Sequence, residues 1–370
     1  MISHDQNNTN CQCKHDHNDK QHNSCEHNNC NCENNNCNCE HDNCNSENNN
    51  CNCENNNCNC EHDNCNSENN QLQAEYQSKY TQAFNKFDLH LHDEIVQEQT
   101  KKLLEAHFAE NNTKEVMKFL FSTIEVTSLK VTDNEDTILK LVEKINTFTN
   151  ENPAFPHPAG ICVYPRFVNI VSNSLEVDDM EISTVVGGFP SSQTFPEIKT
   201  IETALAIKDG ATEIDTVLPV GYFLAEDYDT VFNELDEIKL SCGDETPLKV
   251  ILEVGALQTA VAVKKAAILA IYSGADYIKT STGKIEPGAT PYSVYTMCRT
   301  IKEYYELTGT KIGIKIAGGV RTTEDAIKYY TIVKEILGEE WLNNSLFRIG
   351  ASSLANNILS SISNKTIKVF

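Results

Sequence analysis

The first 70 residues of this 370-residue chain contain no glycine, proline or aromatic residue, and Ile2 is their only aliphatic side chain. A segment with so little apolar surface cannot form a hydrophobic core. The same segment holds thirteen of the sixteen cysteines and seven of the eleven histidines. We therefore expect residues 1–70 to be a disordered amino-terminal tail of low complexity, rich in Asn and Cys.

Long apolar runs are also missing. No uninterrupted apolar segment approaches the roughly 18 residues that a membrane span requires, and the polar start Met-Ile-Ser-His-Asp-Gln does not resemble a secretion signal. Beyond the tail, Cys162, Cys242 and Cys298 lie in or beside apolar segments, not at the spacings of a disulfide framework. These absences predict a cytoplasmic protein with no membrane partner.

Basic residues are scarce relative to acidic ones. Thirty Lys and Arg oppose 53 Asp and Glu, which gives a formal net charge of −23. The tail contributes −10, from twelve acidic and two basic residues, so −13 remains for the rest of the chain. An acidic surface repels nucleic acid and anionic membranes, so we expect neither as a partner. A basic site in this chain would be local and suited to a small anion.

The tail contains a repeat. Residues 30–49 recur unchanged at 51–70, and each copy repeats a seven-residue unit, Cys-Asn-(Cys/Ser)-Glu-x-x-Asn. Cys-x-Cys pairs beside histidines offer ligands suited to Zn or Cu(I), although no Cys-x-x-Cys pair typical of zinc fingers occurs. The alternative is an expanded, functionally idle repeat, which the identity of the two copies favours. The sequence leaves both alternatives open.

Beyond the tail, residues 71–118 have the composition of a helical amino-terminal extension, in which the amphipathic KKLLEAHFAE could cover the bottom or side of the next domain. Residues 119–365 then alternate regularly. Short apolar or β-branched segments predict eight strands, and helix signals fill the intervals between them. The segments lie at 121–128, 161–165, 182–190, 212–219, 248–254, 277–282, 311–319 and 346–353.

Helix signals support this alternation. Thr290 before Pro291, and Thr322 three residues before Asp325, are typical helix starts. Ile198, Ile201 and Leu205 give one apolar helical face. Eight β and α units within about 245 residues favour a closed (β/α)8 TIM barrel over an open doubly wound sheet.

Four charged residues stand inside otherwise apolar predicted strands: Asp215, Lys249, Lys279 and Lys315. Lys279 and Lys315 belong to neighbouring strands, about 4.8 Å apart, so their ammonium groups can approach each other. Like charge and burial then favour a neutral amine, which is a nucleophile for carbonyl carbon. Asp215 could transfer protons in such chemistry, with Lys249 as a second relay. The alternative is a buried ion-pair network in which Asp215 balances the lysines.

Two glycine-containing turns predict an anion site after the seventh and eighth strands. They comprise Gly318, Gly319, Gly350, Ser352 and Ser353. Backbone N–H groups and Ser hydroxyls at these strand ends commonly hold phosphate in barrels. Thr282 and Lys284, after the sixth strand, could contribute from the side. Either turn alone could be structural, but the two together favour a phosphate site.

Five segments resemble the deoxyribose-phosphate aldolase family, in order and at comparable spacing: ICVYPRF, GATEID, YIKTSTGK, IKIAGGVRT and FRIGASS. The resemblance covers nearly all of residues 120–360. It implies a class I aldolase, without a metal in the barrel or another cofactor, that cleaves 2-deoxy-D-ribose 5-phosphate to D-glyceraldehyde 3-phosphate and acetaldehyde in deoxyribose phosphate catabolism. It also implies that Lys279 forms the Schiff base, that Lys315 favours its unprotonated form, and that Asp215 belongs to the proton relay. Phosphate is then expected on the two turns, with Lys284 nearby.

Three positions depart from the family pattern. Glu125 stands where the family usually has Asp, and it could bind a substrate hydroxyl. Ile316 replaces Pro in Lys-Pro-Ala-Gly-Gly, and Phe370 ends the chain where some members have a mobile Tyr that assists proton transfer. Cys162, at the end of the second strand, is either a small core residue, the commoner role, or a reactive thiol near the substrate.

Two other functions stay open at this point. The Cys-rich tail could bind metal beside a non-catalytic barrel, although retention of Lys279, Lys315 and Asp215 argues against this. Alternatively, the barrel could be a Schiff-base aldolase for a different sugar phosphate. The expected partners are a small-molecule sugar phosphate and an aldehyde, and analogy with relatives suggests a homo-oligomer.

Overall fold

The computed structural model describes residues 30–33, 36–39, 52–54, 57–59 and 79–370. Contacts divide the chain into two units, Met1–Glu75 and Tyr76–Phe370. In the first unit, β1 (Cys30–Glu33) pairs antiparallel with β2 (Asn36–Cys39), and β3 (Asn52–Glu54) pairs antiparallel with β4 (Asn57–Asn59). The rest of the predicted tail lies outside the described residues, so its disorder and its metal binding stay predictions.

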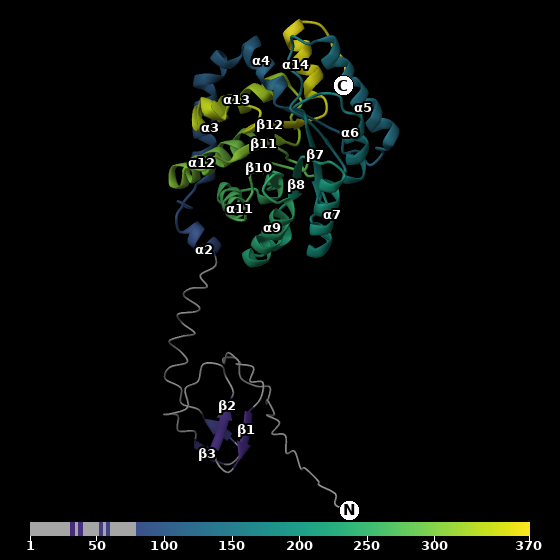
Figure 1. Cartoon of the computed structure of the whole chain (residues 1–370). Coiled ribbons are helices and arrows are strands. Elements are labelled where there is room, and N and C mark those ends of the chain that lie inside the picture. The colour runs from purple at the N-terminus through teal and green to yellow at the C-terminus, as the bar shows by residue number, and fades with distance from the viewer. Residues whose placement is uncertain (1–29, 34–35, 40–51, 55–56, 60–78) are drawn as a thin grey trace, which may run out of the picture. The chain divides into compact units, whose positions relative to one another are not determined.

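The second unit is built around a closed barrel of eight parallel strands (Figure 1). Each strand pairs with the next one along the chain, and β12 closes the barrel on β5. The strands are β5 (Ile124–Thr127), β6 (Gly160–Val163), β7 (Glu181–Val186), β8 (Glu213–Val217), β9 (Leu248–Ile251), β10 (Tyr277–Lys279), β11 (Gly313–Ala317) and β12 (Phe347–Ala351). All eight predicted strands are present, which confirms the predicted (β/α)8 barrel.

Helices follow the strands and surround the barrel. The longer ones are α5 (Glu135–Glu151), α6 (Val168–Ser174), α7 (Pro196–Lys208), α9 (Tyr228–Cys242), α11 (Ala260–Tyr272), α12 (Pro291–Thr308), α13 (Thr323–Leu337) and α14 (Leu354–Ser363). Shorter turns are η1 (Pro165–Phe167), α8 (Val220–Leu224), α10 (Val254–Leu257) and η2 (Glu339–Trp341). The predicted starts of α12 and α13 are confirmed, because the Thr290 and Thr322 hydroxyls each accept a capping hydrogen bond of 3.1 Å. Within the described residues, no helix combines the length and the apolar character needed to cross a bilayer.

Among the described residues, the helices α2 (Lys79–Phe84), α3 (Asp93–Asn111) and α4 (Lys114–Ser122) precede the barrel. α3, which contains the amphipathic segment of the predicted extension, lies against α12 and α13. At one end, Asp93 Oδ1 accepts hydrogen bonds from Tyr292 Oη (2.6 Å) and from the Ala260 backbone N–H (2.9 Å). At the other end, Asn111 Nδ2 donates to Thr331 Oγ1 at 3.2 Å. The helix therefore covers the side of the barrel.

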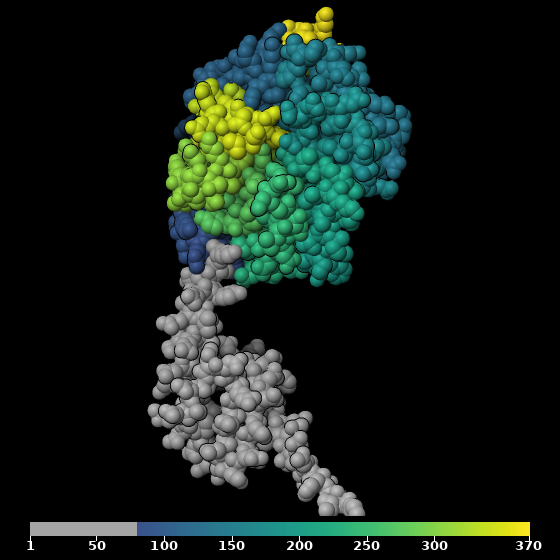
Figure 2. Space-filling model, viewed as in Figure 1, coloured from purple at the N-terminus to yellow at the C-terminus, as the bar shows by residue number. Residues whose placement is uncertain are grey.

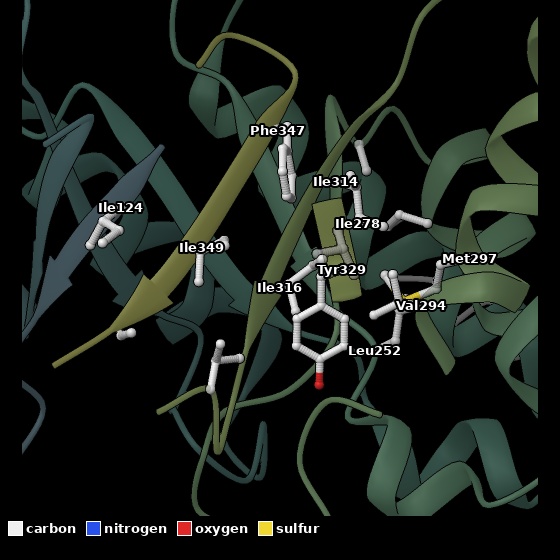
Figure 3. Packing of buried hydrophobic residues seen from close by; sticks show 14 of the residues in the cluster. Ile124, Leu252, Ile278, Val294, Met297, Ile314, Ile316, Tyr329, Phe347 and Ile349 are labelled. Carbon is white, nitrogen blue, oxygen red and sulfur yellow. The ribbon is translucent and has the colours of Figure 1, made fainter. Parts of the chain in front are cut away.

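The hydrophobic core lies between the strands and the surrounding helices. Side chains of β10, β11, α12 and α13 meet in one buried cluster (Figure 3), among them Ile278, Ile314, Ile316, Val294, Met297 and Tyr329. Because side chains alternate along a strand, the residues between these isoleucines point into the barrel. The interior therefore receives other side chains, among them Lys279 and Lys315, both buried.

The apolar face predicted for α7 is present, but it points away from the core. Ile198, Ile201 and Leu205 are 49%, 54% and 54% exposed. The buried residues of the helix are instead Lys199, Thr203 and Ala206. The spacing of the apolar residues correctly predicted that they share one face of α7. The usual assumption that such a face packs against the chain's own core is wrong here.

The carboxyl terminus is packed against the barrel unit. The Phe370 ring centroid lies 5.3 Å from that of Phe148 and 6.1 Å from that of Phe121. Asn356 holds the same segment, because its Nδ2 donates to the Phe370 carbonyl and its Oδ1 accepts from the Val369 N–H, both at 2.7 Å. Phe121 lies at the end of α4, three residues before β5 begins, and Phe148 lies in the last turn of α5. The terminal ring is therefore on the side of the strands' amino ends, whereas barrel chemistry takes place at their carboxyl ends.

Replacement of Phe370 by Ala should lower the free energy of unfolding by about 1–3 kcal/mol, because a partly buried ring loses its aromatic contacts. Chemical denaturation of the full chain measures this difference. The variant Phe370→Leu, which keeps apolar bulk, should lose less. Equal stability of wild type and Phe370→Ala would contradict the packing of the terminal ring.

Candidate active site

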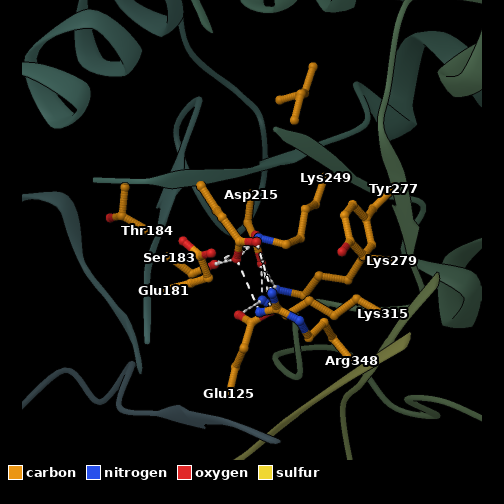
Figure 4. Close-up of polar contacts among 12 residues, drawn as sticks. Glu125, Glu181, Ser183, Thr184, Asp215, Lys249, Tyr277, Lys279, Lys315 and Arg348 are labelled. Carbon is orange, nitrogen blue, oxygen red and sulfur yellow. Dashed lines mark hydrogen bonds and ion pairs between the residues drawn. The ribbon is translucent and has the colours of Figure 1, made fainter. Parts of the chain in front are cut away.

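The four charged strand residues found in the sequence lie side by side in the barrel. Lys279 of β10 is the register partner of Lys315 of β11, and Asp215 of β8 is the register partner of Lys249 of β9. All four side chains are buried, and Figure 4 shows their polar ends converging from different strands. Closure of the barrel thus brings together residues that are up to 100 positions apart in the chain.

Asp215 is shared by three lysines. Its Oδ2 accepts hydrogen bonds from Lys279 Nζ and from Lys315 Nζ, each at 2.6 Å. Its Oδ1 lies 3.3 Å from Lys249 Nζ, but within the described residues this oxygen accepts no hydrogen bond. One carboxylate oxygen therefore holds two ammonium groups together, while the other is available to a substrate proton.

Two further acidic residues and an arginine complete the ionic cluster. Glu125 accepts a short hydrogen bond from Lys315 Nζ, and it lies 3.5 Å from Arg348 Nη1. Glu213 Oε2 accepts from Lys249 Nζ at 2.6 Å, and its Oε1 accepts from Arg348 Nη2 at 3.2 Å. Glu125 is therefore committed to ion pairs, although its predicted contact with a substrate hydroxyl stays untested.

Charge is not balanced within this cluster. Four cations (Lys249, Lys279, Lys315, Arg348) face three carboxylates (Glu125, Glu213, Asp215) when all are ionised. Among the described residues, Lys279 has one carboxylate within 4.0 Å, whereas Lys315 has two and Lys249 has three. Lys279 is therefore the lysine of this cluster that is held by the fewest ion pairs within the described residues.

The cations control the acidity of the buried carboxylates. Burial alone would raise the pKa of Asp215, but the ammonium groups of Lys279 and Lys315 outweigh it and hold that pKa far below its usual range. Burial would also raise the pKa of Glu125, and Lys249 and Lys315 instead lower it to about 2. Conversely, burial disfavours charged Lys315, while Asp215 and Glu125 raise its pKa above the ordinary value. Asp215 is therefore ionised at neutral pH and Lys315 is protonated.

Glu213 and Arg348 were not identified from the sequence, although the criterion that found Asp215 and the lysines applies to them. Both are charged residues inside apolar strands, TEIDTV and LFRIG. Glu213 lies two positions before Asp215, so both side chains point to the same face of β8. Ser183 was also missed, and its hydroxyl accepts from Lys249 Nζ at 2.8 Å. A neutral hydroxyl in a strand gives no comparable signal.

The two predicted phosphate-binding turns are neighbours in the structure. Ala317 of β11 pairs with Gly350 of β12, so the segments that follow them leave the barrel side by side. Gly318 and Gly319 adopt positive φ angles of 89° and 78°, which an L side chain would disfavour. Ser352 and Ser353 are exposed, and in the described chain the Ser353 side chain makes no capping hydrogen bond to α14. The first N–H groups of α14 are thus open to an anion.

The loop after β10 flanks the same turn. Gly283 lies against Gly318, since a Cβ atom built on Gly283 would be only 3.6 Å from the Gly318 Cα. Ala289, farther along the same loop, donates its backbone N–H to the Gly318 carbonyl at 2.9 Å. Thr282, however, directs its hydroxyl to Glu253, and Lys284 Nζ donates to the Leu129 carbonyl at 2.5 Å. The predicted phosphate contacts of these two side chains stay predictions.

Cys162 is buried beside the ionic cluster. Burial raises the pKa of its thiol to about 11, which favours the unreactive protonated form. Its sulfur and carboxylate oxygens of Glu125 and Asp215 lie within 4.8 Å of one another, close enough to share a metal ion. Both carboxylates already bind lysines, and those ammonium groups would repel a cation. The donor set therefore fits a core position better than a metal site.

Known proteins resemble this chain. The sequence model of the family described as "DeoC/LacD family aldolase" matches residues 125–357. A Caenorhabditis elegans protein named "Putative deoxyribose-phosphate aldolase" is 41% identical over 270 residues, which are 72% of this chain and 87% of that protein. The Homo sapiens "Deoxyribose-phosphate aldolase" is 41% identical over 202 residues, 54% of this chain and 63% of the human protein. The solved structure "QR15, an Aldolase" superposes with a TM-score of 0.52 at 28% identity, covering 65% of this chain and 96% of that one.

The lowered pKa of Glu125 predicts an acid-sensitive contribution to stability. This contribution is complete above pH 4.5, the ordinary pKa of Glu, and it is lost as pH falls toward about 2, the pKa in the folded chain. The loss amounts to about 3 kcal/mol by linkage. Urea unfolding at a series of pH values should show a smaller decline in Glu125→Gln than in wild type. The exposed control Glu115→Gln should follow wild type, and an unchanged pH profile of Glu125→Gln would refute the ion pairing.

Proposed function

The chain belongs to the DeoC/LacD family of aldolases, and we propose that it cleaves 2-deoxy-D-ribose 5-phosphate to D-glyceraldehyde 3-phosphate and acetaldehyde through a Schiff base on Lys279. The observation that carries this proposal is Lys279 Nζ sharing Asp215 Oδ2 with Lys315 Nζ, at 2.6 Å each. An amine buried beside a second cation and a carboxylate can lose its proton, attack a carbonyl carbon and exchange protons locally.

The reaction begins with addition of the neutral Lys279 amine to the sugar C1 carbonyl. The resulting carbinolamine loses water, after a proton is delivered to its oxygen, and becomes an iminium ion. Protonated Lys315, held by Asp215 and Glu125, is placed to supply that proton. The iminium ion then accepts the electron pair of the C2–C3 bond.

Cleavage of the C2–C3 bond requires removal of the proton of the C3 hydroxyl. Asp215 Oδ1 is a buried carboxylate oxygen that accepts no hydrogen bond within the described residues, so it can accept this proton directly or through water. D-Glyceraldehyde 3-phosphate leaves, and the remaining two-carbon enamine is protonated at C2. Water then hydrolyses the iminium ion, releases acetaldehyde and restores the Lys279 amine.

Substrate phosphate binds at the turns after β11 and β12. Gly318, Gly319 and Gly350 let the backbone approach an anion, and Ser352 and Ser353 offer hydroxyls beside the open N–H groups of α14. Placing the phosphate there leaves the aldehyde end of the sugar to reach toward Lys279. Lys249 completes the cluster as a second relay.

The proposal also covers the cofactor, the location, the assembly and the domains of the enzyme. The Schiff base activates the substrate carbonyl, so no metal or other cofactor is needed. The enzyme acts in the cytoplasm on small molecules and assembles as a homo-oligomer, with residues 119–365 as the catalytic barrel and residues 1–70 outside the reaction. In the competing hypothesis, the Cys-rich tail binds metal and the barrel is not catalytic.

Removal of the Lys279 amine should abolish turnover. We expect Lys279→Ala to lower kcat by at least about 10³-fold, because carboxylates raise the pKa of Lys249 and Lys315 and keep these neighbouring amines protonated. A coupled assay for D-glyceraldehyde 3-phosphate measures the rate. The exposed-lysine control Lys118→Ala should retain wild-type activity. Wild-type turnover in Lys279→Ala would remove this lysine from the mechanism.

A negative charge at the phosphate turn should act selectively on phosphorylated substrate. We expect Ser353→Glu to lower kcat/KM for 2-deoxy-D-ribose 5-phosphate by about 10²-fold, and to change the value for unphosphorylated 2-deoxy-D-ribose much less. Ser363→Glu, at the exposed end of the same helix, is the matched control. Equal losses for both sugars would place the phosphate elsewhere.

A further inference from the structure

Glu253, which follows β9, has two unfavourable features at once. Its backbone adopts φ 58° and ψ 59°, a left-handed conformation that is strained for any residue other than glycine. The residue is also buried, with 1% of its surface exposed. A buried carboxylate is normally paired with a cation, yet within the described residues its hydrogen bonds come from Thr282 alone. Strain and burial at one residue beside the active site indicate a specific task for this carboxylate.

The carboxylate binds the loop that follows β10. The Thr282 backbone N–H donates to Glu253 Oε1 at 3.2 Å, and the Thr282 hydroxyl donates to Glu253 Oε2 in a short hydrogen bond. The same hydroxyl accepts the Lys284 backbone N–H at 3.1 Å. Burial raises the pKa of the Glu253 carboxyl, whereas the hydrogen bonds from Thr282 and the charge of Lys279 lower it. The loop therefore stabilises the ionised form of the carboxylate that holds it.

The backbone on either side of Glu253 holds a different part of this loop. The Leu252 N–H donates to the Lys279 carbonyl at 2.8 Å, and the Val254 N–H donates to the Thr280 carbonyl at 3.0 Å. Neither bond involves the Glu253 side chain. Loss of that side chain would therefore leave Lys279 in place and release only the part of the loop that follows.

The released part packs directly against the first predicted phosphate turn. A Cβ atom built on Gly288 would lie only 2.4 Å from the Gly318 carbonyl oxygen. On its other side the loop meets α10, where a Cβ atom built on Gly255 would lie 2.2 Å from the Pro287 carbonyl oxygen. In Figure 2, the green segments, which on the colour bar include residues 253–288, adjoin the yellow carboxyl-terminal part of the chain. A shift of the loop would therefore displace the phosphate turn.

We propose that Glu253 is a positioning residue for the substrate phosphate. Its carboxylate holds Thr282, and through it the backbone of Lys284, so that the loop after β10 forms one wall of the phosphate site. Glu253 does not touch the anion, which its charge would repel. The inference rests on the proposed function, because it takes the phosphate of 2-deoxy-D-ribose 5-phosphate as the ligand of the turns after β11 and β12.

Steady-state kinetics of Glu253→Gly test this role. Glycine removes the carboxylate and also relieves the left-handed conformation, so the variant should fold. We expect KM for 2-deoxy-D-ribose 5-phosphate to rise roughly tenfold while kcat stays within about twofold, because Lys279 keeps its backbone hydrogen bonds. For unphosphorylated 2-deoxy-D-ribose, kcat/KM should change by less than about threefold.

Glu226→Gly is the matched control. Glu226 also has a positive φ angle, 60°, but it is exposed in the turn between α8 and α9. The same substitution there relieves the same backbone strain without touching the loop after β10. Glu226→Gly should therefore keep the wild-type KM for the phosphorylated sugar.

Two further variants address the contact itself. Glu253→Gln keeps a side chain that can bond Thr282, so its KM should stay within about threefold of wild type. Thr282→Val removes the contact from the side of the loop and should raise KM about as much as Glu253→Gly does. The double variant Glu253→Gly/Thr282→Val should be no worse than the more impaired single variant, because both changes remove one contact.

Three results would overturn the inference: an unchanged KM in Glu253→Gly, equal losses for the two sugars, or losses that multiply in the double variant. Circular dichroism and thermal unfolding report whether each variant is folded. If Glu253→Gly does not fold, Thr282→Val measures the same contact.

Imine formation separates this inference from the proposed function. Acetaldehyde and borohydride should modify Lys279 in Glu253→Gly as fully as in wild type, since acetaldehyde carries no phosphate. A wild type without an adduct would overturn both the proposed function and the inference. An adduct in wild type together with an unchanged KM in folded Glu253→Gly would overturn the positioning role alone.

Discussion

Two ammonium groups held on one buried carboxylate oxygen are the contact on which the barrel interior depends. Lys279 and Lys315 both donate to Asp215 Oδ2, and each of the three residues is at most 3% exposed. Buried charges are tolerated only when they are paired, so the other charged residues of the interior are needed as well. Glu125 neutralises Lys315, and Glu213 joins Lys249 to Arg348. The fold thus has an apolar shell outside its strands and an ionic core inside them.

This arrangement links stability to chemistry. The cluster has one more cation than it has carboxylates, and Lys279 is the lysine with the fewest carboxylate partners within the described residues. Lys279 and Lys315 hold Asp215 in its ionised form, because they lower the pKa of its carboxyl. Truncation of Glu213 would remove the carboxylate that joins Lys249 to Arg348, so it would disturb the ion pairs as well as the packing.

The sequence was sufficient for the fold and for most of the buried ionic cluster, whereas the catalytic roles of its residues stay predictions. Eight strands were recognisable because β-branched runs recur at the spacing of β/α units, and Lys279, Lys315 and Asp215 stood out as charges in apolar strands. Glu213 and Arg348 met the same criterion but were overlooked. Their pairing across the barrel could not be read from spacing, since it depends on closure between β12 and β5. The sequence also did not show that the apolar face of α7 points to solvent, because the spacing of apolar residues defines a helical face and not what that face packs against. The positions of Thr282 and Lys284 depend on loop geometry, which local sequence does not determine.

The central claim is that Lys279 forms an imine with the substrate carbonyl. Incubation with acetaldehyde and borohydride, followed by intact mass measurement and peptide mapping, tests it in wild type, in Lys279→Ala and in a chain lacking residues 1–70. The account predicts one reduced two-carbon adduct on Lys279 that is lost in Lys279→Ala and kept in the truncated chain. An unmodified Lys279 in the folded wild type would contradict the account and would leave metal binding by the tail as the leading function.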